Sequence, residues 1–508
     1  MVFSRGDAAG DNETLDHIET NNNDVELVTW DGPDDPENPF NWSLRQKWAI
    51  TGLAILATFI TIFNGTIITV AHDATNAAFH VSDAGFPNSY WPVTSWSMGG
   101  AFSSLFLLPL MEDFGVRGVF LSTWAVFILF VIPQAVAQNF ATMIVTRFFA
   151  GGCCSILSNT AATVIGNIWQ TDRERNSTVR LYIAAYMAGS SIGPVIGAPI
   201  FQFLSWRWIG YMQLIWYGAF FPIYIFWFKE CREIAILGKR AKALRQKGRC
   251  AYTQHELDRE GTSMLQIVVR SASRPMVMFF TEGVLFILAL WSAFTVGTLY
   301  LFTQSVEQVF AALYGWSPAD AGYIQSAIVI GQLFGLGFAM FSGKIYFNSA
   351  ARNKECPGTP IPEARLYLAV LGGIFGISGG MFTYAWTSYA SFPWIAPAIG
   401  LSMVGAGSIL VVEGLSGYLM DAYSNYAASA VGACVTGENI LSAFLPLAAG
   451  SMYTNLGFQW ASSLLALISL ILCLGPILFV IYGKEIRAKS PLMTSGMMEK
   501  ARENTESV

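Results

Sequence analysis

The stretch MAGSSIGPVIGAPI, residues 187–200, is compatible with two very different kinds of protein. Its letters GSSIG fit the G-x-S-x-G pattern of a hydrolase nucleophile elbow, which would make Ser191 a catalytic nucleophile. The same letters place Gly189, Gly193 and Gly197 four residues apart, on one face of a helix. Small residues at this spacing allow two membrane helices to approach closely. The sequence around this stretch decides between the two interpretations.

Apolar runs of about 20 residues, the length that crosses a hydrocarbon layer of about 30 Å as a helix, recur along the chain. Of its 508 residues, 53% are hydrophobic and only 12% are charged, against about 25% charged in an average soluble domain. The predicted spans are 48–71, 88–110, 118–137, 141–167, 179–203, 207–228, 276–302, 320–342, 365–386, 392–418, 427–453 and 459–482. The sequence therefore predicts an all-α polytopic membrane protein with twelve transmembrane helices in two six-helix bundles, residues 47–228 and 276–482.

The positions of Lys and Arg predict the orientation in the membrane, because these residues are enriched in cytoplasmic loops. With both termini in the cytoplasm, all but two of the 29 Lys and Arg residues, Arg147 and Arg207, lie on the inner side. We expect an acidic, disordered cytoplasmic tail at 1–46, a basic cytoplasmic loop at 229–275 and a second tail at 483–508. The plasma membrane is the expected location, with the vacuolar membrane as the alternative.

The central loop contains EIAILGKRAKALRQKGR, residues 233–249, in which apolar and basic residues alternate at helical spacing. This pattern is typical of an interfacial helix that binds anionic lipid. A solvated basic linker that only satisfies the topology would show the same composition. The sequence leaves both interpretations open.

The nucleophile interpretation of Ser191 fails for want of a base. A serine nucleophile needs a general base within hydrogen-bond reach. The chain has four His residues, at positions 17, 72, 80 and 255, and none lies inside a predicted span. Proline inside a membrane helix bends it, which neighbouring helices tolerate. Residues 187–200 are therefore predicted to be a bent, closely packed helix, and the protein is not expected to be an enzyme.

Several motifs resemble those of the major facilitator superfamily, in particular the fungal twelve-span drug:proton antiporters. In GSSIGPVIGAP, the residues Gly189, Gly193, Pro194 and Gly197 match the span 5 signature of proton-coupled exporters, with Ala198 in place of its last Gly. TRFFAGG is similar to the span 4 motif, matching at Arg147 and Gly151. DPENPFNW, SWRWIGYMQLI and YGKEIRAKS resemble the segments at the starts of spans 1 and 6 and the end of span 12. The resemblance implies the major facilitator fold and proton-coupled export.

Three segments depart from the family pattern. The loop after span 2 reads LPLMEDFGVR, which keeps Gly115 and Arg117 of the motif but carries Glu112 and Asp113 where the family has Asp and Arg. In span 7, FTEG has Gly283 where the family often has Pro after the acid. In span 11, Glu438 lies near the place where relatives typically carry Arg.

Four charged residues within the predicted spans are the candidates for proton coupling: Arg147, Glu282, Glu413 and Glu438. Each costs about 2.5–3.5 kcal/mol near the middle of a bilayer, so such residues are commonly functional. Glu438 is the first choice, because it lies near the midplane, where a bare carboxylate is most costly. Structural pairing remains the alternative for each acid, and cation recognition is a further one for Glu438. Arg147 requires an anionic or carbonyl partner.

The predicted function is efflux of amphipathic organic compounds such as drugs, toxins or secondary metabolites, by alternating access and in exchange for protons. No P-loop is present, since GFAMFSGK has five residues between its glycines where the motif has four. A proton symporter that imports a nutrient is the alternative, and a receptor on a transporter scaffold is a more distant one. The expected partners are a small-molecule substrate, protons and the lipid bilayer. We expect a monomer, without cofactor, metal or nucleic acid.

Overall fold

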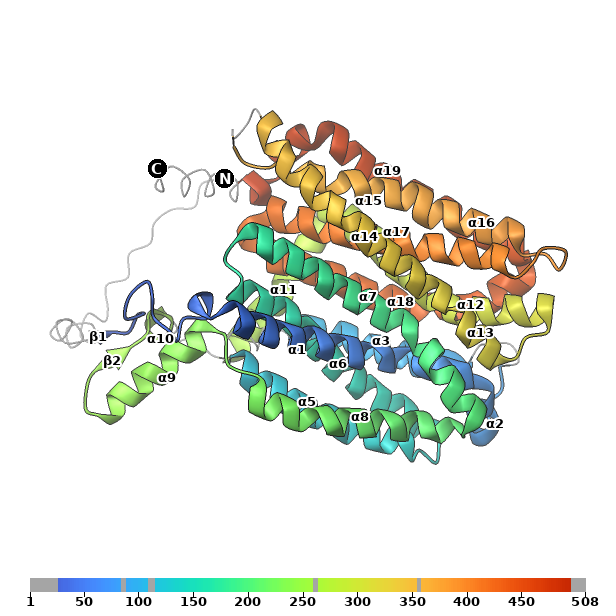
Figure 1. The fold of residues 1–508 in the computed structure, drawn as a ribbon, viewed down its shortest axis with the longest axis horizontal. Coiled ribbons are helices and arrows are strands. Elements are labelled where there is room, and N and C mark those ends of the chain that lie inside the picture. The colour runs from blue at the N-terminus through green and yellow to red at the C-terminus, as the bar shows by residue number, and fades with distance from the viewer. Residues whose placement is uncertain (1–25, 84–87, 108–114, 259–263, 354–357, 495–508) are drawn as a thin grey trace, which may run out of the picture.

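The computed structural model describes residues 26–83, 88–107, 115–258, 264–353 and 358–494. Long helices run side by side through the molecule (Figure 1). The first and last described segments lie at the same end of this bundle, here called the terminal end; the end that carries α2 and α13 is called the opposite end.

Two groups of helices build the bundle. The first half comprises α1 (Leu44–Ile62), α3 (Trp91–Phe106), α5 (Val116–Ala135), α6 (Phe140–Ile168), α7 (Asp172–Phe203) and α8 (Trp206–Trp227). The second half comprises α12 (Gly283–Tyr314), α14 (Ser326–Ser349), α15 (Leu366–Leu371) continued through a π-helical segment (Gly372–Ser378) into α16 (Gly379–Thr387), α17 (Ile395–Tyr423), α18 (Ala427–Leu456) and α19 (Phe458–Lys489). The halves meet mainly where α3 packs on α18 and α7 packs on α14.

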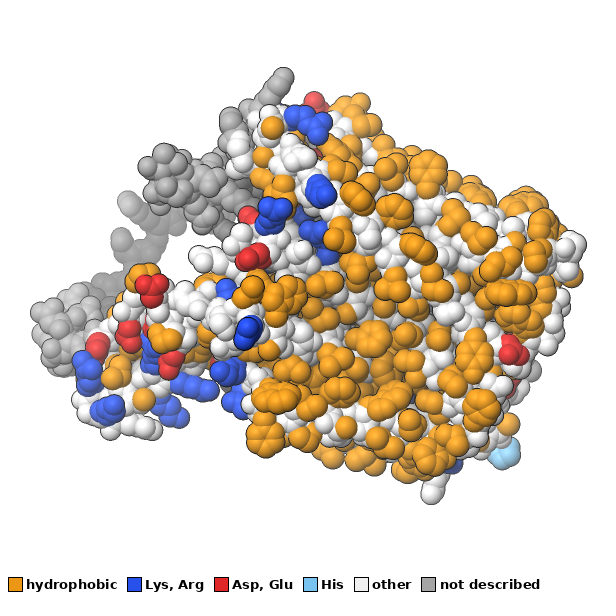
Figure 2. All heavy atoms as spheres, viewed as in Figure 1, with side chains coloured by type: hydrophobic (Ala, Val, Ile, Leu, Met, Phe, Trp, Pro, Cys, Tyr) orange, Lys and Arg blue, Asp and Glu red, His pale blue; other side chains and the backbone are white. Residues whose placement is uncertain are grey.

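Within the described residues, eleven helices are long and apolar enough to cross a membrane. The helix α3 has 16 residues and lies where the second span is predicted, packed against α6 and α18. Large apolar side chains such as Leu129, Phe226 and Ile471 are exposed on the outside of the bundle. Hydrophobic side chains cover the helical face in Figure 2, whereas Lys and Arg gather toward the terminal end. This pattern fits helices that face lipid with their backbone groups satisfied internally, and it confirms the predicted all-α polytopic fold.

Further elements complete the described chain. These are α2 (His72–Phe79), α9 (Glu233–Gln246), α10 (Gln254–Asp258), α11 (Met264–Thr281), α13 (Pro318–Ile324), the strands β1 (Glu26–Leu27) and β2 (Ala251–Tyr252), and 3-10 turns at Pro39–Asn41, Phe63–Gly65, Ile67–Ala71, Asn88–Tyr90, Ala350–Arg352, Pro362–Arg365 and Ser424–Tyr426.

Two spans, the first and the seventh, differ most from the predicted bounds. The first α-helix ends at Ile62, and 3-10 turns carry the chain on to α2, whereas the sequence predicts a continuous span to residue 71. The seventh span begins at Gly283 and runs to Tyr314, twelve residues beyond the predicted end at 302. The polar letters TQSVEQ interrupt the apolar run there, but Thr303, Ser305 and Val306 are buried and Gln308 donates to Thr454 of α18 at 3.0 Å, so this segment packs within the bundle.

Residues 26–46, expected to be disordered as part of the acidic tail, form defined structure, while residues 1–25 lie outside the described residues. The strand β1 pairs in parallel with β2 of the central loop, in the register Glu26 to Ala251. The Asp35 carboxylate accepts from both Nη atoms of Arg240, at 2.7 and 2.9 Å. Acidic residues of the tail thus pair with basic residues of the loop. The composition of each segment by itself does not predict this pairing. We call β1, β2, α9 and α10 with residues 28–43 the terminal platform.

The helix α9 uses its apolar side within this platform. Leu237 and Ala241 are buried against Val28 and Ala251. The apolar stripe that predicted a lipid-binding or solvated helix is therefore covered by the chain's own N-terminal segment. In Figure 1 the platform projects from the terminal end beyond the long helices.

Candidate functional site

Arg147 lies on α6 and is buried at the point where the first α-helix breaks. Its Nη2 donates to the carbonyl oxygens of Asn64 and Gly65, at 3.1 and 2.7 Å, and its Nε donates to that of Pro92, at 2.7 Å. Carbonyl groups released by the break thereby regain hydrogen bonds. Among the described residues no carboxylate pairs with Arg147. Of the two kinds of partner predicted for it, anionic or carbonyl, the structure shows carbonyl groups from the backbone of two neighbouring spans.

The glycines of the span 5 motif pack against the same broken segment. A Cβ atom built on Gly189 would collide with the Ile62 side chain, and one on Gly193 with the Thr66 hydroxyl. A Cβ on Gly197 would lie 2.5 Å from the carbonyl oxygen of Ile67. The glycines therefore leave one face of α7 without side chains, and the turns after α1 pack directly against this face.

The opposite face of α7 contacts the second half. The Gln332 amide of α14 donates to Ser191 Oγ at 2.8 Å and to the Met187 carbonyl at 3.2 Å. Ser191 is thus engaged in a contact between the halves, with no histidine among its hydrogen-bond partners. Across the span 4 motif, a Cβ on Gly151 would collide with the Trp96 carbonyl, so α3 and α6 also pack at backbone distance.

Both halves line a cavity of about 140 Å³, here called the central cavity, which is formed by the parts of α6, α7, α17 and α18 toward the terminal end. Asn159, Tyr182, Tyr186 and the exposed Arg175 contribute from the first half, and Met420 and Glu438 from the second. Most of the remaining lining is aliphatic, namely Ala162, Ile165, Val179, Ile183, Val412, Leu419, Val431 and Val435. An apolar cavity with a few polar groups is typical of a site for organic ligands, but such sites usually span about 300–1,000 Å³. A ligand of that size requires the halves to move apart.

Glu438 is buried in the wall of this cavity. Its carboxylate accepts from Ser292 Oγ of α12 at 2.5 Å, and no Lys or Arg pairs with it among the described residues. The neighbouring Asn439 faces another way: its Oδ1 lies 2.8 Å from the position of a Cβ on Gly100 of α3. An uncompensated acid in an apolar wall is costly when it is ionised, and this chemistry suits a group that takes up and releases a proton.

Glu413, by contrast, has cationic neighbours. Its Oε1 lies 3.7 Å from the Arg180 Nε of α7, so this pair joins the two halves near the terminal end. Close by, Arg365 of the second half pairs with Asp421 at 2.8 Å and donates to Asn176 Oδ1 of the first half at 3.1 Å. These contacts join the two halves near the terminal end.

Glu282 lies between α11 and α12, outside the apolar body of the span in which it was expected. It accepts hydrogen bonds from Ser490 Oγ at 2.8 Å and Tyr423 Oη at 3.4 Å, and both partners belong to the second half. The structure therefore places Glu282 in a junction with the residue that follows α19. Glu282 does not line the central cavity.

Of the loop motif after span 2, Glu112 and Asp113 lie outside the described residues. Gly115 takes a φ of +85° immediately before α5. The Glu230 carboxylate accepts from the backbone N–H groups of Val116 and Arg117, both at 3.0 Å, and so caps the start of α5. The Arg117 side chain donates to the carbonyl of Ile225 at 2.9 Å. Glu230 was missed because its partner lies far away in sequence.

A second, wider cavity of about 520 Å³ lies between the halves at the opposite end, and we call it the vestibule. His72 Nδ1 of the first half lies 3.5 Å from Glu307 Oε2 of the second. Sequence reasoning missed this pair, because the predicted span ended at residue 302 and His72 was assigned to a loop. The face of α12 that carries Ser292, Tyr300 and Glu307 at helical spacing was the available signal.

Comparison with known proteins gives consistent results. A family model described as Major Facilitator Superfamily matches residues 54–444. The MFS transporter cpaT of Aspergillus oryzae is 32% identical over 93% of this chain and 94% of its own. The citrinin biosynthesis cluster MFS transporter mrr1 of Monascus ruber is 30% identical over 92% of each. The efflux pump atB of Aspergillus terreus is 30% identical over 91% of this chain and 89% of its own.

Among solved structures, a partially occluded, inward-open conformation of the xylose transporter XylE from E. coli superimposes with a TM-score of 0.61. The two are 15% identical, and the match covers 85% of this chain and 97% of XylE. At this identity the likeness concerns the fold. The relatives matched over nearly their whole length are named transporters or efflux pumps, in agreement with the expectation that the chain is not an enzyme.

Proposed function

Because this chain belongs to the major facilitator superfamily, whose members carry small molecules across membranes, we propose that it exports amphipathic organic metabolites in exchange for protons. The cavity between the halves carries this proposal, since it combines aromatic and aliphatic walls with one unpaired acid, Glu438. The names of the relatives support organic metabolites as the substrate class. We place the protein in the plasma membrane, with the terminal end in the cytoplasm.

The arrangement of contacts suggests how access alternates. The halves touch at the terminal end through Arg180 and Glu413, and at the opposite end through His72 and Glu307. Breaking one set while keeping the other opens the cavity to one side of the membrane. Protonation of Glu438 removes its charge. In the proposed cycle a proton and a cationic group of the substrate neutralise this carboxylate alternately.

The broad test is an efflux assay in a host that lacks its own drug pumps. Cells that express the chain should retain less of at least one amphipathic toxin, and a protonophore should restore retention. Increased uptake of a nutrient, without efflux of any compound in the panel, would instead identify a symporter.

The sharper test is Glu438→Gln in reconstituted vesicles, because Gln keeps the shape and the hydrogen bond from Ser292 but cannot carry a proton. This variant should retain counterflow exchange of the exported compound and lose accumulation driven by a pH gradient. Glu282→Gln is the matched control, a buried acid that does not line the cavity, and should behave like the parent protein. Gradient-driven accumulation by Glu438→Gln would exclude Glu438 as the proton carrier.

A further inference from the structure

His72 and Glu307, which join the two halves at the opposite end, belong to a cluster of three side chains of metal-binding type beside the vestibule. His72 and Asp73 come from the start of α2 in the first half, and Glu307 comes from α12 in the second. One ligand atom from each of the three residues lies within 4.8 Å of the other two. The His72 and Glu307 side chains are only 16% and 13% exposed, but both line the vestibule, so water and small ions reach them.

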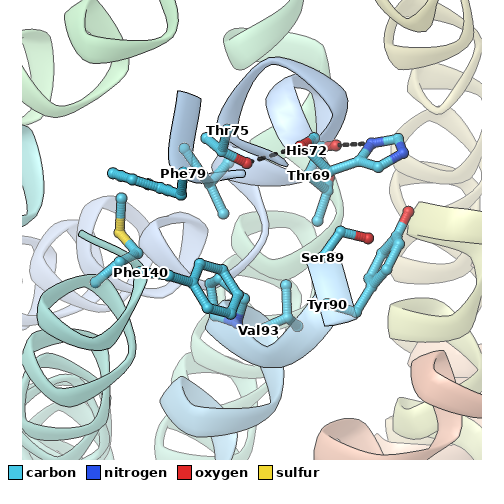
Figure 3. Close-up of a pocket in the computed structure, with 11 residues that line it drawn as sticks. Thr69, His72, Thr75, Phe79, Ser89, Tyr90, Val93 and Phe140 are labelled. Carbon is cyan, nitrogen blue, oxygen red and sulfur yellow. Dashed lines mark hydrogen bonds between the residues drawn. The ribbon is translucent and has the colours of Figure 1, made fainter. Parts of the chain in front are cut away.

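The backbone sets the tautomer of His72. Its Nδ1 lies 2.9 Å from the carbonyl oxygen of Thr69, which can only accept a hydrogen bond, so Nδ1 carries the proton (Figure 3). The lone pair is therefore on Nε2, which lies 3.3 Å from Asp73 Oδ1. A histidine that ligates a metal through one ring nitrogen characteristically donates its other N–H to a carbonyl or carboxylate. His72 already has this arrangement.

The spacing of the ligand atoms suits a small transition-metal ion. Ligands about 2.0–2.2 Å from a tetrahedral zinc ion are about 3.3–3.6 Å apart. The distance of 3.3 Å between His72 Nε2 and Asp73 Oδ1 matches this value. Glu307 Oε2 lies 3.5 Å from His72 Nδ1, so the Glu307 side chain has to turn toward the Nε2 side of the ring to complete the set. Imidazole with two carboxylates leaves a fourth position for water.

An unsatisfied hydroxyl lies beside this set. Tyr90 is 2% exposed, and its Oη has no hydrogen-bond partner among the described residues. The ring of Tyr90 is centred 5.5 Å from that of His72. Figure 3 shows its hydroxyl directed toward the imidazole side of the site. A water bound at the fourth position of a metal would give this hydroxyl a partner.

We propose that His72, Asp73 and Glu307 bind one divalent transition-metal ion, with Zn²⁺ as the preferred ion, and that the bound ion ties the two halves together at the opposite end. Ligands come from both halves, so an ion held by all three opposes their separation. That such an ion arrests transport from the outer face rests on the proposed function. Binding of the metal ion and bridging of the two halves do not depend on the proposed function.

The test uses Zn²⁺ alone with tag-free, EDTA-treated full-length protein in detergent. Titration calorimetry should give one site per chain, and the thermal unfolding midpoint should rise with Zn²⁺ but not with Mg²⁺. His72→Asn and Glu307→Gln should each weaken binding at least tenfold. His80→Asn is the matched control, an exposed histidine eight residues along the chain, and should bind as the parent does. Equal Zn²⁺ affinity in the parent and in His72→Asn would overturn the site.

Hydrogen–deuterium exchange then tests the tie itself. Zn²⁺ should slow exchange in residues 67–79 and 303–314 together, and in the parent but not in Glu307→Gln. Protection confined to residues 67–79 would mean that the ion is held by the first half alone, and the bridge would be wrong. Neither measurement depends on knowing the exported compound, so the metal site and the proposed function fail or stand separately.

Discussion

At the scale of single residues, the four intramembrane charges divide by what surrounds them. Arg147 is held by backbone carbonyls, Glu413 is held by a cation of the other half, and Glu282 is held by hydroxyl donors at a junction. Only Glu438 has a single neutral donor and a cavity beside it. Sequence alone identified all four as exceptional, since each charge is costly inside a membrane. It could not separate them, because their partners come from distant helices.

Replacing Arg147 with Lys tests its role at the helix break. An ammonium group cannot reproduce the guanidinium fork that reaches three carbonyls on two segments, and each lost charge-assisted hydrogen bond is worth about 1.5–3 kcal/mol. We expect Arg147→Lys to lower the thermal unfolding midpoint of the purified protein by several degrees. Arg207→Lys, which loses one bond to the Ala137 carbonyl at a half-buried position, should have a smaller effect. An unchanged midpoint with abolished transport would instead favour a direct role in transport.

At the scale of elements, the composition of a segment predicts a helix better than it predicts where the helix ends. The span 5 motif correctly indicated a closely packed helix, because its glycines share one face. The break after Ile62 was missed, since Asn64 and Gly65 give no stronger signal than many polar residues that helices tolerate. The order of residues 26–46 was missed because it depends on pairing with a loop some 200 residues away.

Adding one methyl group to the span 5 seam should be disproportionately harmful. A Cβ on Gly193 meets the Thr66 hydroxyl and, at 2.7 Å, the Ile67 backbone nitrogen, which cannot move without disturbing the break. Gly193→Ala should therefore reduce both thermal stability and transport. Gly218→Ala on the outer face of α8, where no atom lies within 4 Å, should be neutral or stabilising by about 0.4–1 kcal/mol. Equal effects of the two substitutions would contradict the packing account of the motif.

The terminal platform should detach in acid. Two bonds from Arg240 and two backbone N–H donors, those of Asp31 and Glu37, hold the pKa of Asp35 well below its ordinary value of 3.8. The stabilisation is therefore complete above about pH 4 and is lost as the pH falls through the lowered pKa. The protection of residues 26–43 from hydrogen exchange, relative to the intrinsic exchange rate at each pH, should stay high at pH 5 and fall only in stronger acid. Arg240→Gln should raise this exchange already at neutral pH, and if it does not, Arg240 does not hold the segment.

At the scale of the whole molecule, polar contacts join the halves at both ends of the interface and leave a cavity between them. The contact near the terminal end uses Arg180 and Glu413, whose side chains are 11% and 6% exposed. Breaking a buried ion pair by removing one partner costs about 3–5 kcal/mol, because the remaining charge is left uncompensated. The equilibrium between closed and open terminal ends should therefore respond strongly to this pair.

Glu413→Gln should open the terminal end, seen as faster hydrogen exchange in residues 172–186 of α7 and 409–423 of α17. The exchanged pair Arg180→Glu with Glu413→Arg should restore protection relative to either single change, because it restores attraction across the same interface. Glu363→Gln is the matched control: this acid pairs with Arg487 inside the second half, so its loss should destabilise that half without exposing α7. If Glu363→Gln exposes α7 as much as Glu413→Gln does, the response reflects general loosening of the bundle. The Arg180–Glu413 pair would then not be the contact that sets the balance between the two halves.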